Sequence, residues 1–326
     1  MSKIRSFAVL TSGGDAPGMN AAVRTAVRLG IQRGLKAYGV YGGYRGLMDN
    51  NIHQLTARDV GNIIHVGGTV LGSARAPEFI TEKGQKQALR NLAQKGVDAV
   101  IVVGGNGSQQ GTNALHKLGF PAVGVASTID NDLYGSDITI GVDTALNVAL
   151  EAIDRLRVTA GSHNRAFMLE VMGRDCGYLG LMAGLAGGAE WVQIPESEYP
   201  PERVAQSLMK AYERGKKYSI VVVAEGCDND ADELYHYFKD HKESIGFPVR
   251  LTRLGHVQRG GTPTASDRIL ASRLAAKAVE CVLDGTHGVL VGTIAGHLTT
   301  TPLETVVSNK KELDLSLLEL AHELSR

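Results

Sequence analysis

The stretch Ala122–Asp132, AVGVASTIDND, contains the features on which the fold prediction rests. Ala122–Ala126 is a short apolar run, which is typical of a buried strand. Thr128, Asp130 and Asp132 then place a hydroxyl and two carboxylates where that strand ends. Ligands of open α/β sheets bind beyond the carboxyl ends of the strands, so these groups are candidates for a substrate site. Asp and Asn also cap their own backbone in loops, and the motif taken alone is more typical of a turn.

The rest of the chain alternates strand and helix patterns. Ile4–Leu10 precedes the loop TSGGDAPG and a helix over about Met19–Arg33, and Asp98–Val103 precedes GGNGS and a helix to about Leu118. Further strands are expected at Lys36–Tyr41, Ala166–Met172, Trp191–Ile194, Tyr218–Ala224, Arg250–Leu254 and Gly288–Ala295. Further helices are expected at Thr81–Lys95, Thr139–Gly161, Cys176–Gly188, Pro201–Arg214, Asp230–Lys242, Ala265–Asp284 and Lys311–Leu324. This alternation predicts a parallel, doubly wound α/β sheet.

Composition limits the function classes. With 326 residues, 43% of them hydrophobic, the chain is longer than one core usually requires, so two domains are expected. Lys+Arg and Asp+Glu both total 34, and this balance argues against a nucleic-acid-binding or membrane-binding protein. The three cysteines lack metal-ligand spacing, so neither zinc nor a disulfide is expected. No signal-peptide pattern or membrane-length apolar run is present, which predicts a cytoplasmic protein.

The glycine-containing loops indicate a polyphosphate site. Glycine lets backbone N–H groups approach a phosphate closely, and a helix N-terminus adds partial positive charge. None of the loops has the Walker A spacing or the G-x-G-x-x-G pattern, so a dinucleotide-dependent dehydrogenase loses its strongest support. Arg75, Arg174 and Arg259 follow or precede glycines, and arginine binds phosphate with two parallel hydrogen bonds. Each of these arginines alone is more typical of a solvated surface, although Arg174 directly follows an apolar run.

Seven motifs then occur in a specific order. They are TSGGDAPGMNAA (11–22), GGTVLGSAR (67–75), GGNGS (104–108), TIDND (128–132), EAIDRLR (151–157), EVMGRDCG (170–177) and LGHVQRGG (254–261). In this order the chain resembles the bacterial ATP-dependent 6-phosphofructokinases over essentially its whole length. That family transfers the γ-phosphoryl group of ATP, its co-substrate, to the 1-hydroxyl of fructose 6-phosphate, with Mg²⁺. Its members are homotetramers whose sites are shared between subunits.

The resemblance implies two doubly wound, Rossmann-like domains with the active site in the cleft between them. Residues 1–138 plus 251–300 would form the nucleotide-binding domain, and residues 139–250 plus 301–326 the sugar-phosphate-binding domain. Asp130 would take the proton of the sugar hydroxyl, Thr128 and Arg174 would stabilise the transferred phosphoryl group, and Asp132 would support the metal. Such assistance by a positioned carboxylate suits phosphoryl transfer.

The resemblance also assigns the binding residues. Those that match sugar-phosphate contacts are Arg165, Met172, Gly173, Glu225, Arg250, His256 and Arg259, of which Arg165 and Arg250 would reach in from a neighbouring subunit. Those on the nucleotide side are Gly14, Tyr44, Arg75, Ala76, Asn106, Gly107, Ser108 and Gly111. Asn106 replaces the aspartate that helps to hold magnesium, and Ala76 replaces an aromatic residue near the adenine.

Two alternatives stay open. Pyrophosphate-dependent relatives have Asp where this chain has Gly107 and Lys where it has Ser127, so both positions favour ATP. The neutral Asn106 also leaves open a catalytically silent subunit that binds sugar phosphate. An effector site for ADP or phosphoenolpyruvate is implied by Arg24, Arg28, Arg157, Gly188, Glu190, Arg214 and Lys216, although a solvated basic face has the same pattern.

Overall fold

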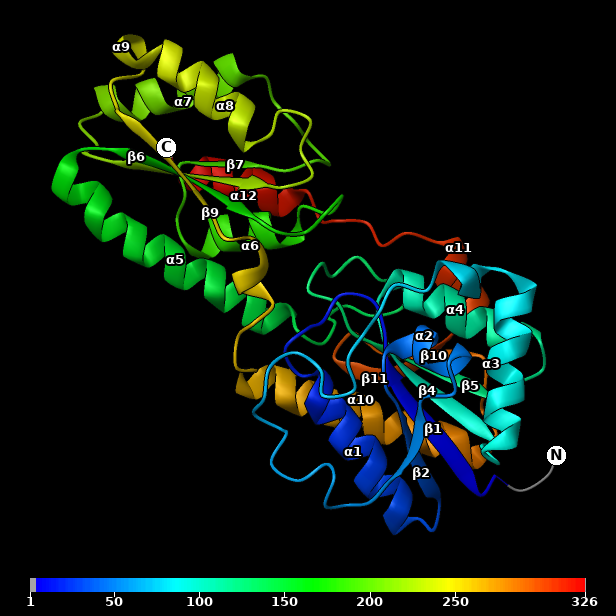
Figure 1. The fold of residues 1–326 in the computed structure, drawn as a ribbon. Coiled ribbons are helices and arrows are strands. Elements are labelled where there is room, and N and C mark those ends of the chain that lie inside the picture. The colour runs from blue at the N-terminus through cyan, green and yellow to red at the C-terminus, as the bar shows by residue number, and fades with distance from the viewer. Residues whose placement is uncertain (1–3, 326) are drawn as a thin grey trace. The chain divides into compact units, whose positions relative to one another are not determined.

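The computed structural model describes residues 4–325, which fold as two compact α/β units (Figure 1). The first unit consists of the described residues up to Thr144 together with Arg259–Lys311. The second consists of Ala145–Gln258 and the described residues from Glu312 onward. The first segments of the two units end at Thr144 and Gln258, where the sequence predicted 138 and 250, and the last boundary follows Lys311, where it predicted 300.

The first unit is built on a seven-stranded sheet with the order β11-β10-β5-β4-β1-β2-β3. Its strands are β1 (Ser6–Thr11), β2 (Lys36–Val40), β3 (Ile52–Leu55), β4 (Ala99–Gly104), β5 (Ala122–Ala126), β10 (Val289–Ile294) and β11 (His297–Pro302). The strands are parallel except for β3 and β11, which pair antiparallel at the two edges. Every residue of β1, β4 and β5 is buried, as expected for parallel strands covered on both faces.

Helices cover both faces of this sheet (Figure 1). On one face α1 (Met19–Gln32) packs against α10 (Ala265–Asp284), and both helices bury alanines where they approach. On the other face lie α3 (Glu82–Gln94), α4 (Asn106–Lys117) and α11 (Leu303–Ser308). Two short elements, α2 (Gly43–Met48) and η1 (Pro77–Ile80), pack against α3. The predicted doubly wound fold is confirmed.

The second unit contains a four-stranded parallel sheet with the order β7-β8-β6-β9. The strands are β6 (Ala166–Val171), β7 (Trp191–Gln193), β8 (Ser219–Ala224) and β9 (Val249–Arg253), with η2 (Gly255–Gln258) after the last. One face carries α7 (Pro201–Glu213), α8 (Ala231–Asp240) and α9 (Lys242–Ile245), and the other carries α5 (Val142–His163), α6 (Tyr178–Ala186) and α12 (Ser316–Leu324) (Figure 1). A single buried apolar cluster joins both layers to the sheet.

The C-terminal helix is shorter than predicted. The pattern indicated one helix over Lys311–Leu324, whereas residues 309–315 are not helical and α12 begins at Ser316. The Asp314 carboxylate accepts hydrogen bonds from the Ser316 backbone N–H at 3.0 Å and from its hydroxyl at 2.6 Å. These bonds lower the pKa of Asp314 and fix a turn that starts the helix.

The strands β10 and β11 form a hairpin, of which the sequence predicted only β10. Ala295 and Gly296 connect the two strands with φ values of 51° and 77°. Two successive residues with positive φ are characteristic of a tight hairpin turn. Alanine rarely adopts this conformation, so Ala295-Gly296 is only a weak signal for a turn.

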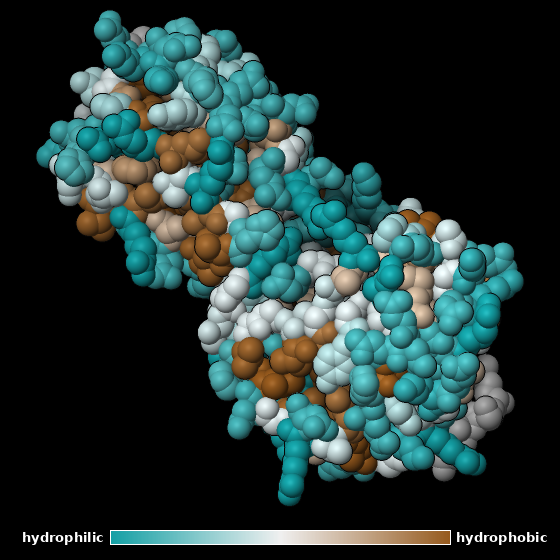
Figure 2. Space-filling view, viewed as in Figure 1, coloured by the Kyte–Doolittle hydropathy of each residue, from teal (hydrophilic) through white to brown (hydrophobic). Residues whose placement is uncertain are grey.

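The visible surface is mainly hydrophilic. On the face drawn in Figure 2, hydrophobic residues form separate patches among hydrophilic ones on both units. Among residues 4–325, none of the helices combines the length and apolar character that spanning a membrane requires.

Candidate active site

Three loops meet at one edge of the sheet in the first unit. β1, β4 and β5 are adjacent and parallel, so the residues that follow them leave the sheet side by side. The Ser12 N–H donates to the Val103 carbonyl at 3.0 Å, and the Ser127 N–H donates to the Gly104 carbonyl at 3.3 Å. The sheet therefore brings the loops TSGGDAPG, GGNGS and TIDND together.

The TIDND loop is held rigidly. The Thr128 hydroxyl accepts the Asp130 N–H at 3.1 Å, and the Thr139 hydroxyl donates to the Thr128 carbonyl at 2.6 Å. Asn131 has a φ of 54°, a conformation that non-glycine residues seldom adopt, and its side chain donates to the Asp137 carbonyl at 3.1 Å. Thr128 and Asp130 are only 8% and 5% exposed. The loop is a turn, as its composition indicates, and it also fixes Asp130 at the strand end.

Asn106 and Asp132, the two residues expected near the metal, lie next to each other. The Asn106 side-chain amide donates to the backbone carbonyl of Asp132 at 3.4 Å. Asp132 itself is partly exposed, so its carboxylate can reach a ligand. An ionised aspartate at position 106 has no N–H or O–H and could not donate this hydrogen bond. The asparagine amide therefore links α4 to the TIDND loop through a contact that an aspartate would not make.

Gly107 is not required by packing. A Cβ atom there would have no heavy atom within 4 Å, and Gly107 does not have a positive φ. Glycine is a poor helix former, yet this one lies in the first turn of α4. By contrast, a Cβ at Gly111 would lie 2.6 Å from the Tyr44 ring, so packing explains that glycine. A side chain at position 107 would therefore enter open space at the N-terminus of α4.

Ser108 adds a polar group beneath the first loop. Its hydroxyl is buried and has no hydrogen-bond partner among the described residues. A Cβ at Gly13 would lie 3.2 Å from this oxygen, which places the hydroxyl under the TSGGDAPG loop. A buried hydroxyl without a partner is rare in proteins and often marks a site that a ligand or water completes.

Tyr44 lies in the core. It is 6% exposed, stacks on Phe79 with ring centroids 4.2 Å apart, and donates to the Ser108 carbonyl at 2.5 Å. Burial raises the pKa of its hydroxyl far above the usual value. Tyr44 thus supports the first turn of α4 from inside, whereas Arg75 is exposed and Ala76 is partly exposed.

Arg259 lies beside Gly14. Its Nη1 atom donates to the Asp15 carbonyl at 3.1 Å, and a Cβ at Gly14 would come within 2.5 Å of that nitrogen. Sequence matching placed Arg259 with the sugar phosphate and Gly14 with the nucleotide, and the structure brings the two into contact within the first unit.

The second unit also collects polar groups at the carboxyl ends of its strands. Glu225 follows β8, and its Oε1 atom accepts the N–H groups of Arg174 at 3.0 Å and Gly173 at 3.4 Å. Arg174 has a φ of 51°, an unusual conformation for arginine that often marks a functional position. Its side chain is exposed.

Gln258 completes this loop and was not singled out from the sequence. It is fully buried, and its Oε1 atom accepts the Met172 N–H at 2.7 Å. His256, two residues earlier in the same motif, is exposed on η2. The position of Gln258 between two named residues of one motif was the signal that could have identified it.

Arg165 and Arg250 lie at the opposite end of the same sheet. Arg165 immediately precedes β6, and Arg250 is the second residue of the parallel strand β9. Arg174 follows the carboxyl end of β6, which has six residues and so spans roughly 17–20 Å. Within one chain the two arginines therefore cannot join the groups around Arg174.

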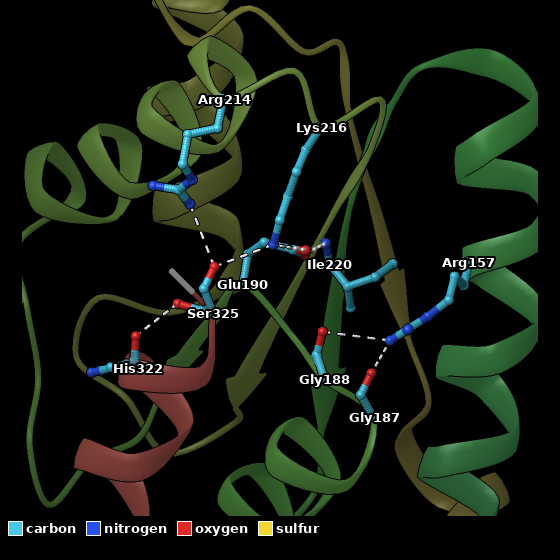
Figure 3. A network of polar contacts seen from close by, with 9 residues as sticks. All are labelled: Arg157, Gly187, Gly188, Glu190, Arg214, Lys216, Ile220, His322 and Ser325. Atoms are coloured by element: carbon cyan, nitrogen blue, oxygen red, sulfur yellow. Dashed lines mark hydrogen bonds and ion pairs between the residues drawn. The ribbon is translucent and has the colours of Figure 1, made fainter.

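Figure 3 shows the residues of the second unit that match an effector site. Lys216 Nζ lies 3.1 Å from Glu190 Oε1 and 3.2 Å from the Ser325 carbonyl, to which Arg214 also donates at 3.4 Å. Arg157 donates to the carbonyls of Gly187 and Gly188. Five of the seven residues expected at that site thus take part in polar contacts within the second unit. Lys216 is paired with the Glu190 carboxylate, whereas Arg157 and Arg214 are held by carbonyl oxygens, which do not neutralise their charge. The other two of the seven, on α1 of the first unit, are Arg24 and Arg28.

Comparisons with known proteins identify relatives of the whole chain. A family model described as Phosphofructokinase matches residues 6–282. An ATP-dependent 6-phosphofructokinase of Natranaerobius thermophilus is 49% identical over 99% of this chain and 100% of the relative. A protein of the same description from Halalkalibacterium halodurans is 47% identical with the same coverage. The structure of Pichia pastoris phosphofructokinase in the T-state is similar with a TM-score of 0.87 and 38% identity, over 94% of this chain and 36% of that one.

Proposed function

Because the chain belongs to the phosphofructokinase family, we propose that it is an ATP-dependent 6-phosphofructokinase. It transfers the γ-phosphoryl group of ATP to the 1-hydroxyl of fructose 6-phosphate, giving fructose 1,6-bisphosphate and ADP. The observation that supports this most strongly is the meeting of the three loops of the first unit, with Asp130 fixed on one and open space above Gly107 on another.

Gly107 favours ATP over pyrophosphate. Neither the backbone conformation nor the packing requires glycine at this position. A side chain would occupy the space in which the nucleotide phosphates approach the N-terminus of α4, whose partial positive charge favours them. An enzyme that uses pyrophosphate does not need this space.

Asp130 acts as the base. The Thr128 hydroxyl accepts the Asp130 backbone N–H and so positions this buried residue at the strand end, where its carboxylate would accept the proton of the sugar 1-hydroxyl. Phosphoryl transfer requires positioning and charge stabilisation more than covalent chemistry. Thr128 and Arg174 would supply that stabilisation, and the Glu225 carboxylate positions the backbone of Arg174.

The residues present fit a magnesium ion that is bound mainly by phosphates and waters. Among residues 4–325, no group of three or more His, Cys, Asp or Glu side chains could hold a metal ion by itself. Asp132 and Asn106 lie side by side and would offer one carboxylate and one amide oxygen. Mg²⁺ commonly takes few protein ligands in phosphate sites, where it neutralises charge on the transferred group.

The sugar phosphate would be bound by residues of two chains. Met172, Gly173, Glu225, His256 and Arg259 would act in their own chain. Arg165 and Arg250, at the other end of the β6–β9 pair, would bind the sugar phosphate of a neighbouring subunit. This division supports an oligomer in which an isolated chain is nearly inactive. We propose that the oligomer is a homotetramer and that the enzyme is cytoplasmic, as the family resemblance implies.

The network around Lys216 would bind an anionic effector. Arg157, Arg214 and Lys216 use carbonyl oxygens to hold their positions, and only Lys216 has a carboxylate partner there, Glu190. A phosphate-bearing effector such as ADP or phosphoenolpyruvate would balance this charge. The roles expected for Arg24 and Arg28 stay predictions from the family resemblance.

A coupled assay with ATP or pyrophosphate as donor tests the proposal. Turnover of fructose 6-phosphate with ATP and Mg²⁺ is expected, and turnover with pyrophosphate alone would contradict it. A silent regulatory subunit would bind fructose 6-phosphate without turnover at saturating Mg²⁺, and activity would appear in the Asn106→Asp variant.

A further inference from the structure

A pocket of about 370 Å³ lies at the edge strand β7 of the second unit. It is lined by Trp191, Arg203, Gln206, Ser207, Lys210, Arg214, His322 and Ser325. These residues come from β7, from α7 and the residue that ends it, and from α12 and the residue after it. The volume is in the range of small-molecule sites. We refer to it as the α7–α12 pocket.

The α7 side of this pocket is a stripe of cations. Arg203, Lys210 and Arg214 follow the spacing i, i+7, i+11, with Ser207 at i+4, so they lie along one side of the helix. Arg203 is in the first turn, where the helix dipole disfavours a positive charge. Helix stability therefore does not explain its presence.

These cations have no acidic partners. Within residues 4–325 neither Arg203 nor Lys210 forms an ion pair, and the pocket lining contains no Asp or Glu. Arg203 is held by its position over the Tyr199 ring, 4.3 Å from the centroid. Arg214 is held by the Ser325 carbonyl (Figure 3). The positive charge is thus positioned by neutral groups and is not neutralised by them.

Trp191 offers little surface on which a nucleobase could stack. Trp191 is 6% exposed and stacks on His322 with ring centroids 4.3 Å apart, while its Nε1 donates to Gln193 at 3.2 Å. Recognition in this pocket therefore depends on charge and on the hydroxyl and amide groups of Ser207 and Gln206.

We propose that the α7–α12 pocket binds a small, multiply charged phosphate anion. Arginine and lysine side chains with hydroxyl donors beside them are the groups that such anions require. The pocket has only Arg214 in common with the effector residues, because Arg157, Gly188, Glu190 and Lys216 do not line it. It is a further anion site of the second unit.

The single tryptophan of the chain makes the site directly observable, because Trp191 lines it. The full-length protein is titrated with inorganic tripolyphosphate at low ionic strength, without Mg²⁺, and binding is followed by tryptophan fluorescence and by calorimetry. Saturable binding is expected. The Arg203→Gln/Lys210→Gln variant is expected to raise the half-saturating concentration at least about tenfold, since two charged contacts are lost. Its turnover at saturating substrates shows that it is folded.

The control variant Arg24→Gln/Arg28→Gln loses the same charge from α1. It should bind tripolyphosphate at this pocket as the wild type does. Equal binding by the Arg203→Gln/Lys210→Gln variant, or no saturable binding by either method, would overturn the proposal. Loss of binding by the Arg24→Gln/Arg28→Gln variant alone would also overturn the proposal, because the anion would then occupy the effector site. ADP should saturate the pocket without a large advantage over tripolyphosphate, and binding of ADP alone would indicate nucleoside recognition instead.

Discussion

The two ends of the parallel sheets carry different kinds of polar residues. At the carboxyl ends, the Asp130 N–H donates to the Thr128 hydroxyl of its own loop and the Arg174 N–H donates to Glu225, the residue after β8, with unusual backbone conformations at Asn131 and Arg174. At the amino ends of β6 and β9 lie Arg165 and Arg250, and within residues 4–325 the Arg250 side chain donates only to the adjacent Val249 carbonyl. We propose catalytic roles for Asp130 and Arg174, and we propose that Arg165 and Arg250 bind the substrate phosphate of a neighbouring chain.

Among the substitutions considered, replacing Asp130, which lies at the carboxyl end of β5, should reduce turnover the most. Asp130→Ser is expected to lower kcat roughly 10²–10⁴-fold, because the sugar hydroxyl loses its base, while fructose 6-phosphate still binds. Initial rates and equilibrium binding of the sugar measure both. The exposed carboxylate of Asp240 provides a matched control, and Asp240→Ser should be neutral. Turnover of Asp130→Ser at the wild-type rate would exclude the residue as base.

Arg174 should have the next largest effect. Arg174→Gln is expected to lower kcat roughly 10²–10³-fold, because it removes a cation that stabilises the transferred phosphoryl group. The hydrogen bonds of its backbone to Glu225 do not involve the side chain and should persist. A change in the KM for fructose 6-phosphate with an unchanged kcat would show that Arg174 only binds the ground state.

Substituting Arg165 or Arg250, at the amino ends of β6 and β9, should weaken the binding of fructose 6-phosphate. Arg165→Gln and Arg250→Gln are each expected to raise the KM for fructose 6-phosphate roughly tenfold to a hundredfold, since each loses a charged hydrogen bond to phosphate. kcat should change less. Arg155→Gln removes an exposed arginine of α5 as the control. Equal losses in kcat and kcat/KM would place the two arginines with Arg174 instead.

Substitution of Gly107 tests the role proposed for the N-terminus of α4 in ATP binding. Gly107→Asp is expected to weaken ATP binding roughly tenfold while the thermal midpoint changes little, because the new side chain enters open space in the free protein. Gly107→Ala provides the smaller step. A large drop in the thermal midpoint would mean that the glycine is structural after all.

Asn106 should give the smallest effect. Asn106→Asp is expected to lower the Mg²⁺ concentration at half-maximal rate by a few fold, because a carboxylate binds the ion more tightly than an amide. Direct Mg²⁺ binding in the presence of ATP provides a readout that does not depend on turnover. An unchanged Mg²⁺ dependence would assign Asn106 to the hydrogen bond with the Asp132 carbonyl.

The sequence predicted the parts of the fold that depend on long apolar patterns. The strand Ala122–Ala126 and the helix Ala265–Asp284 were predicted with their observed bounds, since burial and capping determine both. β3 and β11 were missed because short edge strands with exposed polar residues lack a buried run. The helix predicted over Lys311–Leu324 begins late because a side-chain turn at Asp314 competes with it.

The candidate site could likewise be predicted only in part. The loops could be placed because strand order brings successive carboxyl ends together. The buried role of Tyr44 and the contact of Gln258 with Met172 depend on residues far apart in the chain, which no local pattern records. The contact of Arg259 with Gly14 has the same origin.

Mixing two variants that are both impaired at low fructose 6-phosphate tests most directly whether Arg165 completes another chain's site. Asp130→Ser keeps Arg165, and Arg165→Gln keeps Asp130. In tetramers that contain both chains, a site with an intact Asp130 beside a neighbour's intact Arg165 should work, and random assembly forms it at about one quarter of the sites. Activity well above the sum of the two parents, at low fructose 6-phosphate, is the predicted result. Activity equal to that sum would contradict the account.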